Sequence, residues 1–125
     1  MTAASNSAHL LGDSGPFAEA LDGFAPREAQ IRMAEAVEDC LQDGTSMVVE
    51  AGTGIGKTLA YLVPAKLSGE RVINSTGTKT LQDQLFIRDL PLHKGALNVS
   101  AVTALLKGRG NYLCLHRMNI ARTEG

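Results

Sequence analysis

The fold is decided by the stretch Glu50-Ala51-Gly52-Thr53-Gly54-Ile55-Gly56-Lys57-Thr58, a glycine-rich turn that ends in Lys-Thr. The apolar run before it, residues 46–50, predicts a buried strand, and residues 57–67 after it predict a helix. A strand, a glycine-rich turn and a helix that opens with Lys-Thr are the context required of a phosphate-binding loop. The stretch therefore predicts a site for a nucleoside triphosphate.

The chemistry of this loop follows from its residue types. Glycines let the backbone curl so that successive N–H groups point at phosphate oxygens, and the helix N-terminus adds positive charge. The Lys57 ammonium would reach the β- and γ-phosphates, and the Thr58 hydroxyl would hold Mg²⁺. The first glycine of the general pattern is replaced by Ala51, so Gly52 and Gly54 supply the flexibility. The expected nucleotide-binding residues of the loop are Ala51, Gly52, Thr53, Gly54, Ile55, Gly56, Lys57 and Thr58.

Length and composition are those of one soluble globular domain. The chain has 125 residues, of which 44% are hydrophobic and 20% charged. Apolar runs stay well below the roughly 20 residues of a membrane span, and the chain does not open with a signal-peptide pattern. We therefore expect a cytoplasmic protein without a membrane partner. Its two cysteines do not form a disulfide framework.

Charge is distributed unevenly along the chain. Residues 1–50 carry nine acidic and two basic residues, whereas residues 51–125 carry four acidic and ten basic residues. The basic part suits a polyanionic ligand. Ordinary solvated helix faces would produce the same pattern, and charge alone favours that interpretation.

The order of predicted elements indicates an α/β fold. Residues 1–23 are expected to be a flexible segment, within which a short helix near residues 17–21 would fit. Strands are predicted at 46–50, 71–76 and 98–102, and helices at 27–42, 57–67 and 78–90. Alternation of strands and helices predicts parallel strands with crossover helices, as in part of a RecA-like P-loop NTPase domain. Pro64 should kink or weaken the last turn of the second of these helices, and Pro91 should end the third.

An acidic motif that P-loop enzymes require is missing. A carboxylate at the end of a strand should hold Mg²⁺ and position water. After Thr58, Asp83 and Asp89 fall on a predicted helix, Glu70 lies in a turn, and Glu124 is terminal. The sequence thus looks like the front of a larger enzyme, and we expect no ATP turnover by this chain alone.

Four segments together resemble the DinG-type, XPD-related iron–sulfur DNA helicases of superfamily two, with the bacterial DinG/YoaA branch most similar. They are Phe24 with Arg27-Glu28-Ala29-Gln30, the loop 50–58, the run 75–85, and the run 105–114. The resemblance covers about residues 24–120. The phosphate-binding loop occurs in many ATPases, but its combination with the two later segments is far more specific.

The resemblance assigns roles to residues outside the loop. Arg27 and Gln30 would select adenine, and an amide pairs well with an adenine edge; a surface position on a helix is the alternative for Gln30. Contacts with the DNA backbone would come from Thr76, Thr78, Lys79 and Thr80. Hydroxyls and a helix N-terminus suit phosphate, although the same residues would also serve as a helix cap.

The resemblance also implies a [4Fe–4S] cluster for which Cys114 is the first ligand. The other cysteine, Cys40, precedes the loop and is not part of the pattern. Since such a cluster takes four thiolates, this chain should not assemble one by itself. Lys107 and Arg109 would meet DNA or stay solvated. The expected divisions are a flexible segment 1–23, part of the ATP-binding domain at 24–104, and the start of the iron–sulfur domain at 105–125.

The function implied is that of the ATP-binding N-terminal part of an ATP-dependent DNA helicase. In the whole protein, ATP hydrolysis with Mg²⁺ would drive movement along single-stranded DNA and unwinding of duplexes in DNA repair. Two alternatives stay open: another P-loop enzyme, such as a small-molecule kinase, and a nucleotide-binding module without catalysis. Adenine preference separates the first alternative from a helicase, and ATP hydrolysis stimulated by single-stranded DNA separates the second.

Overall fold

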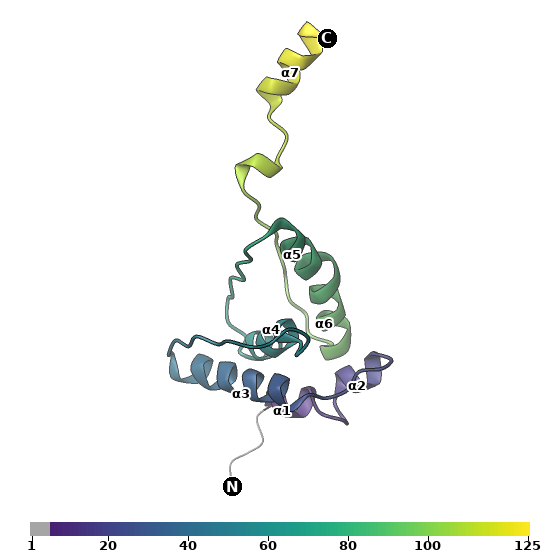
Figure 1. The fold of residues 1–125 in the computed structure, drawn as a ribbon, viewed down its shortest axis with the longest axis vertical. Helices are drawn as coiled ribbons and strands as arrows, with labels where there is room; N and C mark the ends of the chain where they lie inside the picture. Colours follow the sequence, from purple (N-terminus) through teal and green to yellow (C-terminus); the bar gives the residue numbers. More distant parts are fainter. Residues whose placement is uncertain (1–5) are drawn as a thin grey trace.

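The computed structural model describes residues 6–125 as a body of packed helices from which the C-terminal part extends (Figure 1). The first described residues and the C-terminus lie at opposite ends of the molecule. The α-helices are α1 Asn6–Leu10, α2 Pro16–Ala20, α3 Glu28–Asp43, α4 Lys57–Leu67, α5 Lys79–Gln84, α6 Leu90–Leu97 and α7 Leu115–Glu124. A π-helical turn, η1 Leu85–Asp89, joins α5 to α6, and a 3₁₀ turn, η2 Arg109–Asn111, precedes α7.

Helices α3 and α4 pack against each other and form the base of the body. The predicted helices 27–42 and 57–67 are both confirmed. Helix α3 ends at Gly44, whose φ of 66° is a left-handed conformation that glycine adopts without steric cost. Helix α4 continues through the fully buried Pro64, which lies near its last turn and removes only one backbone hydrogen bond.

The prediction that Pro91 ends the third helix is wrong. Helical structure continues from α5 through η1 into α6, and Pro91 lies in the first turn of α6. The π-helical turn explains why proline is tolerated there. The backbone N–H of Leu90 donates to the carbonyl of Leu85, five residues earlier, so the hydrogen-bond pattern shifts just before the proline. The missing N–H of Pro91 then falls at a helix start, where proline is well accommodated.

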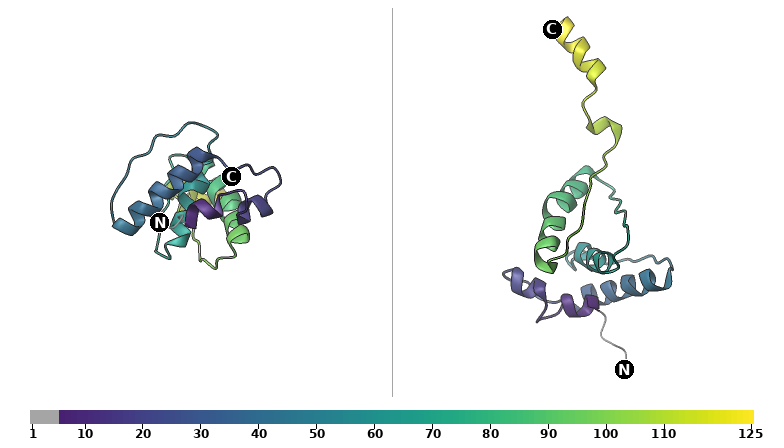
Figure 2. Two further views of the ribbon diagram at one scale, coloured as in Figure 1. Left: turned by 90° about the horizontal axis from the view of Figure 1, so that it is seen from below. Right: turned by 180° about the vertical axis from the view of Figure 1, so that it is seen from behind.

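The beginning of the chain differs from the flexible segment expected for residues 1–23. Of that segment, residues 1–5 lie outside the described part, whereas residues 6–20 include α1 and α2, and α2 nearly coincides with the short helix considered near residues 17–21. Leu11 and Phe17 are fully buried. The backbone N–H of Ser7 donates to the Glu38 carboxylate on α3 at 3.0 Å. Figure 2 shows these helices lying along the base, next to α3 and below α6.

The core lies where these first helices meet α3, α4 and the end of α6. Its fully buried apolar residues are Leu11, Phe17, Ala34, Ala60 and Val63. The ring centroids of Phe17 and Phe24 lie 6.2 Å apart, which is within the range of favourable aromatic pairs. The first described residues therefore close the core and do not hang free of it.

Residues 6–125 contain no β-strand, so the predicted parallel strands stay a prediction. The three segments expected to be strands run as non-helical chain between the helices (Figure 1). A strand is assigned only where a neighbour completes its hydrogen-bond ladder, and these segments have no such neighbour in the described part. Val48, Ile73 and Val102, one from each segment, are between 92% and 102% exposed. The apolar side chains that a central strand would bury are thus on the surface.

The last part of the chain leaves the body as an extended tail. It runs past α5, forms η2 and ends in α7, which projects away from the helices (Figure 1). Except for Met118, every residue from Gly108 to Gly125 is exposed. None of the helices in the described part of the chain is long and apolar enough to cross a membrane.

Candidate nucleotide-binding site

The glycine-rich loop has the backbone conformation expected of a phosphate-binding loop. Gly54 has a φ of 82° and Gly56 a φ of 77°, both in the left-handed region. Gly56 is the residue that caps the N-terminus of α4. A Cβ atom at Gly56 would overlap the side-chain amide nitrogen of Gln30. Glycine is therefore needed at position 56 both for its backbone conformation and for the close approach of a neighbour.

Gln30 ties helix α3 to the loop. Its side chain is only 3% exposed, and Nε2 donates a hydrogen bond to the Gly56 carbonyl at 3.0 Å. The surface-position alternative for Gln30 is therefore wrong. Arg27, one turn earlier, is exposed at the N-terminus of α3. The structure thus brings the predicted adenine-selecting segment against the loop, although the two are separated by about 26 residues in the chain.

Lys57 and Thr58 form the first turn of α4. The Lys57 ammonium is exposed and donates to the carbonyl of Ala51 at 2.9 Å, so the side chain curls back over the loop. Gly52, Thr53 and Gly54 are exposed, whereas Ile55 and Thr58 are half-buried. An ammonium above backbone N–H groups at a helix N-terminus is an arrangement that binds phosphate. These residues fit a nucleoside triphosphate with Mg²⁺.

A cavity of about 320 Å³ joins the loop to a second predicted segment. It is lined by Lys57, Thr58 and Tyr61 from α4 and by Ser75, Thr76 and Gly77 from the turn before α5. Sequence reasoning treated these two segments as separate sites. Their meeting at one cavity is a property of the three-dimensional arrangement.

Asp89, a carboxylate that the sequence places on a helix, is brought to this cavity by the fold. It lines the same cavity as Lys57 and Thr58, and its Oδ1 accepts a hydrogen bond from Arg88 Nε at 3.0 Å. Leu85 precedes it by four residues and therefore lies on the same helix face. That four-residue spacing can be read from the sequence, so it was a usable signal. Asp89 does not follow a strand, so it is not the missing acidic motif.

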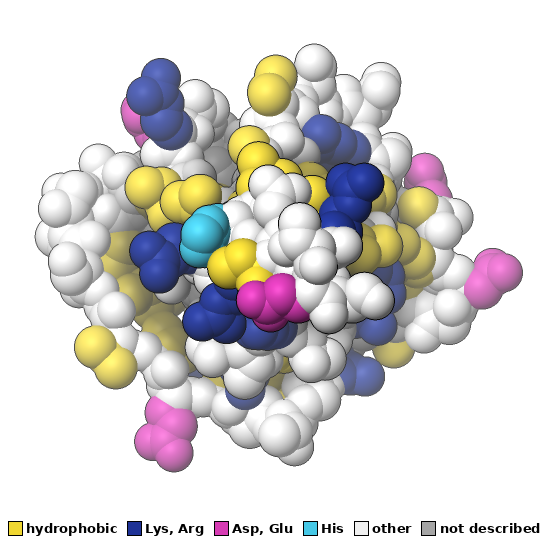
Figure 3. Space-filling model, turned by 90° about the horizontal axis from the view of Figure 1, so that it is seen from above, with side chains coloured by type: hydrophobic (Ala, Val, Ile, Leu, Met, Phe, Trp, Pro, Cys, Tyr) yellow, Lys and Arg dark blue, Asp and Glu magenta, His cyan; other side chains and the backbone are white. Residues whose placement is uncertain are grey.

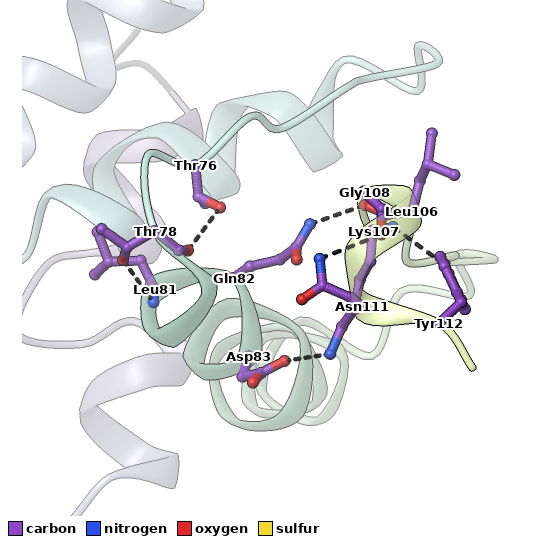
Figure 4. Close-up of polar contacts among 10 residues, drawn as sticks. All are labelled: Thr76, Thr78, Leu81, Gln82, Asp83, Leu106, Lys107, Gly108, Asn111 and Tyr112. Atoms are coloured by element: carbon purple, nitrogen blue, oxygen red, sulfur yellow. Dashed lines mark hydrogen bonds and ion pairs between the residues drawn. The ribbon is translucent and has the colours of Figure 1, made fainter. Parts of the chain in front are cut away.

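The turn before α5 acts as a helix cap. Thr78 Oγ1 accepts a hydrogen bond from the backbone N–H of Leu81 at 3.2 Å, and Thr76 Oγ1 donates to the Thr78 carbonyl at 3.4 Å (Figure 4). Lys79 and Thr80, in the first turn of α5, are exposed. The helix-cap interpretation of this segment is confirmed. The cap does not use the side chains of Lys79 and Thr80. These side chains and the backbone N–H groups at the start of α5 are therefore available to a phosphate.

The described residues do not fit an iron–sulfur cluster. Cys114 is exposed immediately before α7, Cys40 is half-buried on α3, and both thiols are free. Residues 6–125 contain no group of three or more His, Cys, Asp or Glu side chains placed to hold a metal ion. Four thiolates are required, and this chain has two cysteines.

Comparison with known families agrees with this geometry. The model of the DEAD/DEAH box helicase family matches residues 29–112. The chain belongs to the DEAD/DEAH box helicase family. Membership of this family implies a RecA-like fold, as the sequence predicted. The parallel strands were the more detailed part of that prediction. The matched region includes Gln30, the loop and the turn before α5.

Individual relatives confirm the predicted resemblance to DinG and YoaA helicases. The chain is 51% identical over 118 residues to the ATP-dependent DNA helicase YoaA of Haemophilus influenzae, covering 94% of this chain and 18% of the relative. It is 56% identical over 104 residues to YoaA of Escherichia coli, covering 83% and 16%. It is 45% identical over 105 residues to the ATP-dependent helicase DinG of Mycobacterium tuberculosis H37Rv, covering 78% and 16%. The chain thus spans less than a fifth of these relatives, and no solved structure matches it.

Proposed function

We propose that this chain forms the ATP-binding front of an ATP-dependent DNA helicase that moves along single-stranded DNA and unwinds duplexes in DNA repair. The observation that carries the proposal is the shared cavity of Lys57 and Thr58 with Ser75, Thr76 and Gly77. The proposed nucleotide-binding loop and the proposed DNA-contacting turn both contribute residues to the lining of this cavity. A movement of the loop residues around the triphosphate would therefore act directly on the residues that contact DNA.

In this function the loop residues hold ATP and Mg²⁺. The Lys57 ammonium would turn from the Ala51 carbonyl toward the β- and γ-phosphates, and the Thr58 hydroxyl would hold Mg²⁺. Gln30 Nε2 keeps its bond to Gly56, which leaves Oε1 to accept a hydrogen bond from the adenine amino group. The exposed guanidinium of Arg27 lies one turn away and contributes to adenine selection.

The DNA backbone would bind at the turn before α5. Phosphate oxygens accept hydrogen bonds readily from hydroxyls, ammonium groups and helix N-termini. Residues assigned to this contact are Thr76, Thr78, Lys79 and Thr80. Residues 24–104 then form part of the ATP-binding domain. Residues 105–125 would begin an iron–sulfur domain in which Cys114 would supply one of the four thiolates.

Nucleotide binding by the 125-residue chain tests the proposal. ATP should bind more tightly than GTP in a titration with fluorescent nucleotide analogues. Lys57→Ala should weaken ATP binding about 10-fold to 100-fold, since a hydrogen bond to a charged group contributes about 1.5–3 kcal/mol. Gln30→Ala should reduce the preference for ATP over GTP. Steady ATP hydrolysis is not expected from this chain alone.

The matched control is Arg122→Ala, which removes one positive charge from the exposed α7. It should leave ATP affinity unchanged. The proposal fails if Lys57→Ala and Arg122→Ala bind ATP equally well, or if GTP binds as tightly as ATP.

A further inference from the structure

A polar clasp joins helix α5 to the beginning of the tail. Gln82 Nε2 donates to the Leu106 carbonyl at 2.9 Å, and Lys107 Nζ contacts Asp83 Oδ1 at 2.9 Å (Figure 4). The two α5 residues are adjacent, and so are the two tail residues. Two neighbouring bonds between the same segments fix orientation as well as distance, which one bond alone would not do. We call these four residues the clasp.

The tail side of the clasp is internally braced. The backbone N–H of Lys107 donates to the Tyr112 hydroxyl at 3.2 Å, and the Asn111 side chain donates to the Gly108 carbonyl at 3.3 Å. The backbone N–H of Tyr112 donates to the Arg109 carbonyl at 3.2 Å, which closes the turn η2. The turn from Lys107 to Tyr112 is thus one unit, and the clasp holds that unit against α5.

The helix side of the clasp leads directly to the turn before α5. The Thr78 carbonyl accepts hydrogen bonds from both Thr76 Oγ1 and the backbone N–H of Gln82. Thr78 and Gln82 are four residues apart and lie on the same helix face. A short series of bonds therefore runs from Thr76 through Thr78 and Gln82 to the Leu106 carbonyl.

We propose that Gln82 and Asp83 are positioning residues that couple the turn Thr76–Thr80 to the tail, so that phosphate-backbone binding at the turn and the placement of Cys114 depend on each other. The proposal rests on the proposed function, because it takes the turn as the DNA contact. Coupling between two sites is reciprocal: the factor by which the closed clasp raises affinity at the turn equals the factor by which binding at the turn favours the closed clasp.

Distances between two spin labels on the full chain test the positioning directly. One label is attached to the exposed Cys114 and the other to Asp39→Cys on the exposed face of α3, with Cys40→Ala removing the remaining thiol. The distance distribution should be narrow with the clasp intact. Gln82→Ala, Asp83→Lys and Lys107→Asp should each broaden it. The charge exchange Asp83→Lys with Lys107→Asp should restore the narrow distribution.

Affinity for an oligothymidylate is the second readout. Asp83→Lys should weaken binding about fivefold, because exposed bonds of these two kinds contribute little individually. The charge exchange should restore the affinity. Glu70→Lys is the matched control, since it makes the same charge change at an exposed turn outside the clasp. It should leave both the distance distribution and the affinity unchanged.

The two proposals fail in different ways. If the chain does not bind the oligonucleotide but the charge exchange restores the narrow distribution, the DNA contact is wrong and the clasp still positions the tail. If the oligonucleotide binds and the single clasp variants leave both readouts unchanged, the coupling is wrong. Failure of the charge exchange to restore either readout also overturns the coupling. Circular dichroism of every variant establishes that the helices are intact.

Discussion

The single buried side chain of His93 makes the stability of the fold depend on pH. It lies on α6 with no exposed surface, and within residues 6–125 neither ring nitrogen has a hydrogen-bond partner. Its ring meets that of Phe17 edge-on at a centroid distance of 5.1 Å. Burial, and then the positive charge of Lys66, lowers the pKa of His93 to about 4. His93 is therefore neutral in the native protein at neutral pH.

The sign of the pH effect follows from proton uptake. The unfolded chain protonates His93 near its ordinary pKa of about 6.5, whereas the native protein resists protonation until about 4. Between these values the unfolded state binds more protons, so the free energy of unfolding falls as the pH falls. The loss should approach about 3 kcal/mol at pH 4, from about 1.4 kcal/mol per pKa unit.

Urea unfolding of the native sequence and of His93→Phe between pH 7.5 and pH 4 measures this effect. The phenylalanine variant should lose stability much less steeply on acidification, because no buried group then resists protonation. The exposed histidine variant His9→Gln should behave like the native sequence. Parallel curves for the native sequence and His93→Phe would contradict the assignment.

Among the helices, α2 is the one whose contribution to the stability of the fold is easiest to measure. Phe17 is fully buried in the core between α2 and α6, and it contacts both Phe24 and His93. Phe17→Ala should lower the free energy of unfolding by about 3–5 kcal/mol, as is usual for a buried phenylalanine. The change is measured by urea denaturation.

Ile87→Ala is the control for this substitution. Ile87 is 71% exposed on η1, so its truncation should change stability by less than about 0.5 kcal/mol. If the two variants unfold at the same urea concentration, the first helices do not contribute to the core in solution.

The elements differ in how far sequence predicts them. Helices α3 and α4 follow from local signals, namely apolar spacing and a glycine at the end of α3, and their predicted bounds agree with the structure within a residue. Helix α1 does not follow from local signals, because its residues are mostly small or polar and its Ser7 is held by a distant partner, Glu38. The expected strands depend on partners in the same way. The prediction that Pro91 ends a helix was wrong because a π-helical turn has no simple sequence signature.

The residues of the candidate site also differ in how far the sequence predicts them. The glycines of the loop and the Lys-Thr pair are recognisable because their function requires them to be adjacent in sequence. The bond from Gln30 to Gly56 and the meeting of Thr58 with Thr76 at one cavity join residues that are distant in the chain. Periodicity carries no information about such pairs, so only the fold reveals them.

At the scale of the whole molecule, charge separates into an acidic beginning and a basic remainder. Seen from the end at which the tail projects, Lys and Arg side chains occur at several places across the surface, while most Asp and Glu side chains lie at its edge (Figure 3). A surface of this kind attracts a phosphate backbone. Oligothymidylate should bind with an affinity that falls as salt is added.

Fluorescence anisotropy at several salt concentrations measures the number of phosphate contacts. Lys79→Ala should weaken binding and reduce the slope of log K against log salt by about 0.7, the value for one phosphate contact with a single strand. Arg32→Ala removes the same charge from the exposed face of α3 and should leave the slope unchanged. Equal changes in both variants would mean that net charge alone, and not the turn before α5, attracts the DNA.

The π-helical turn also has a consequence for how related sequences are aligned. Such a turn accommodates one more residue than an α-helical turn, and each residue of an α-helix advances by about 100° around the axis. Removing one residue from η1 would therefore leave an ordinary α-helical turn, without that rotation of α6 relative to α5. His93 could then still face Phe17 while Gln82 faces Leu106. Homologues can therefore differ by one residue in η1 and keep both contacts.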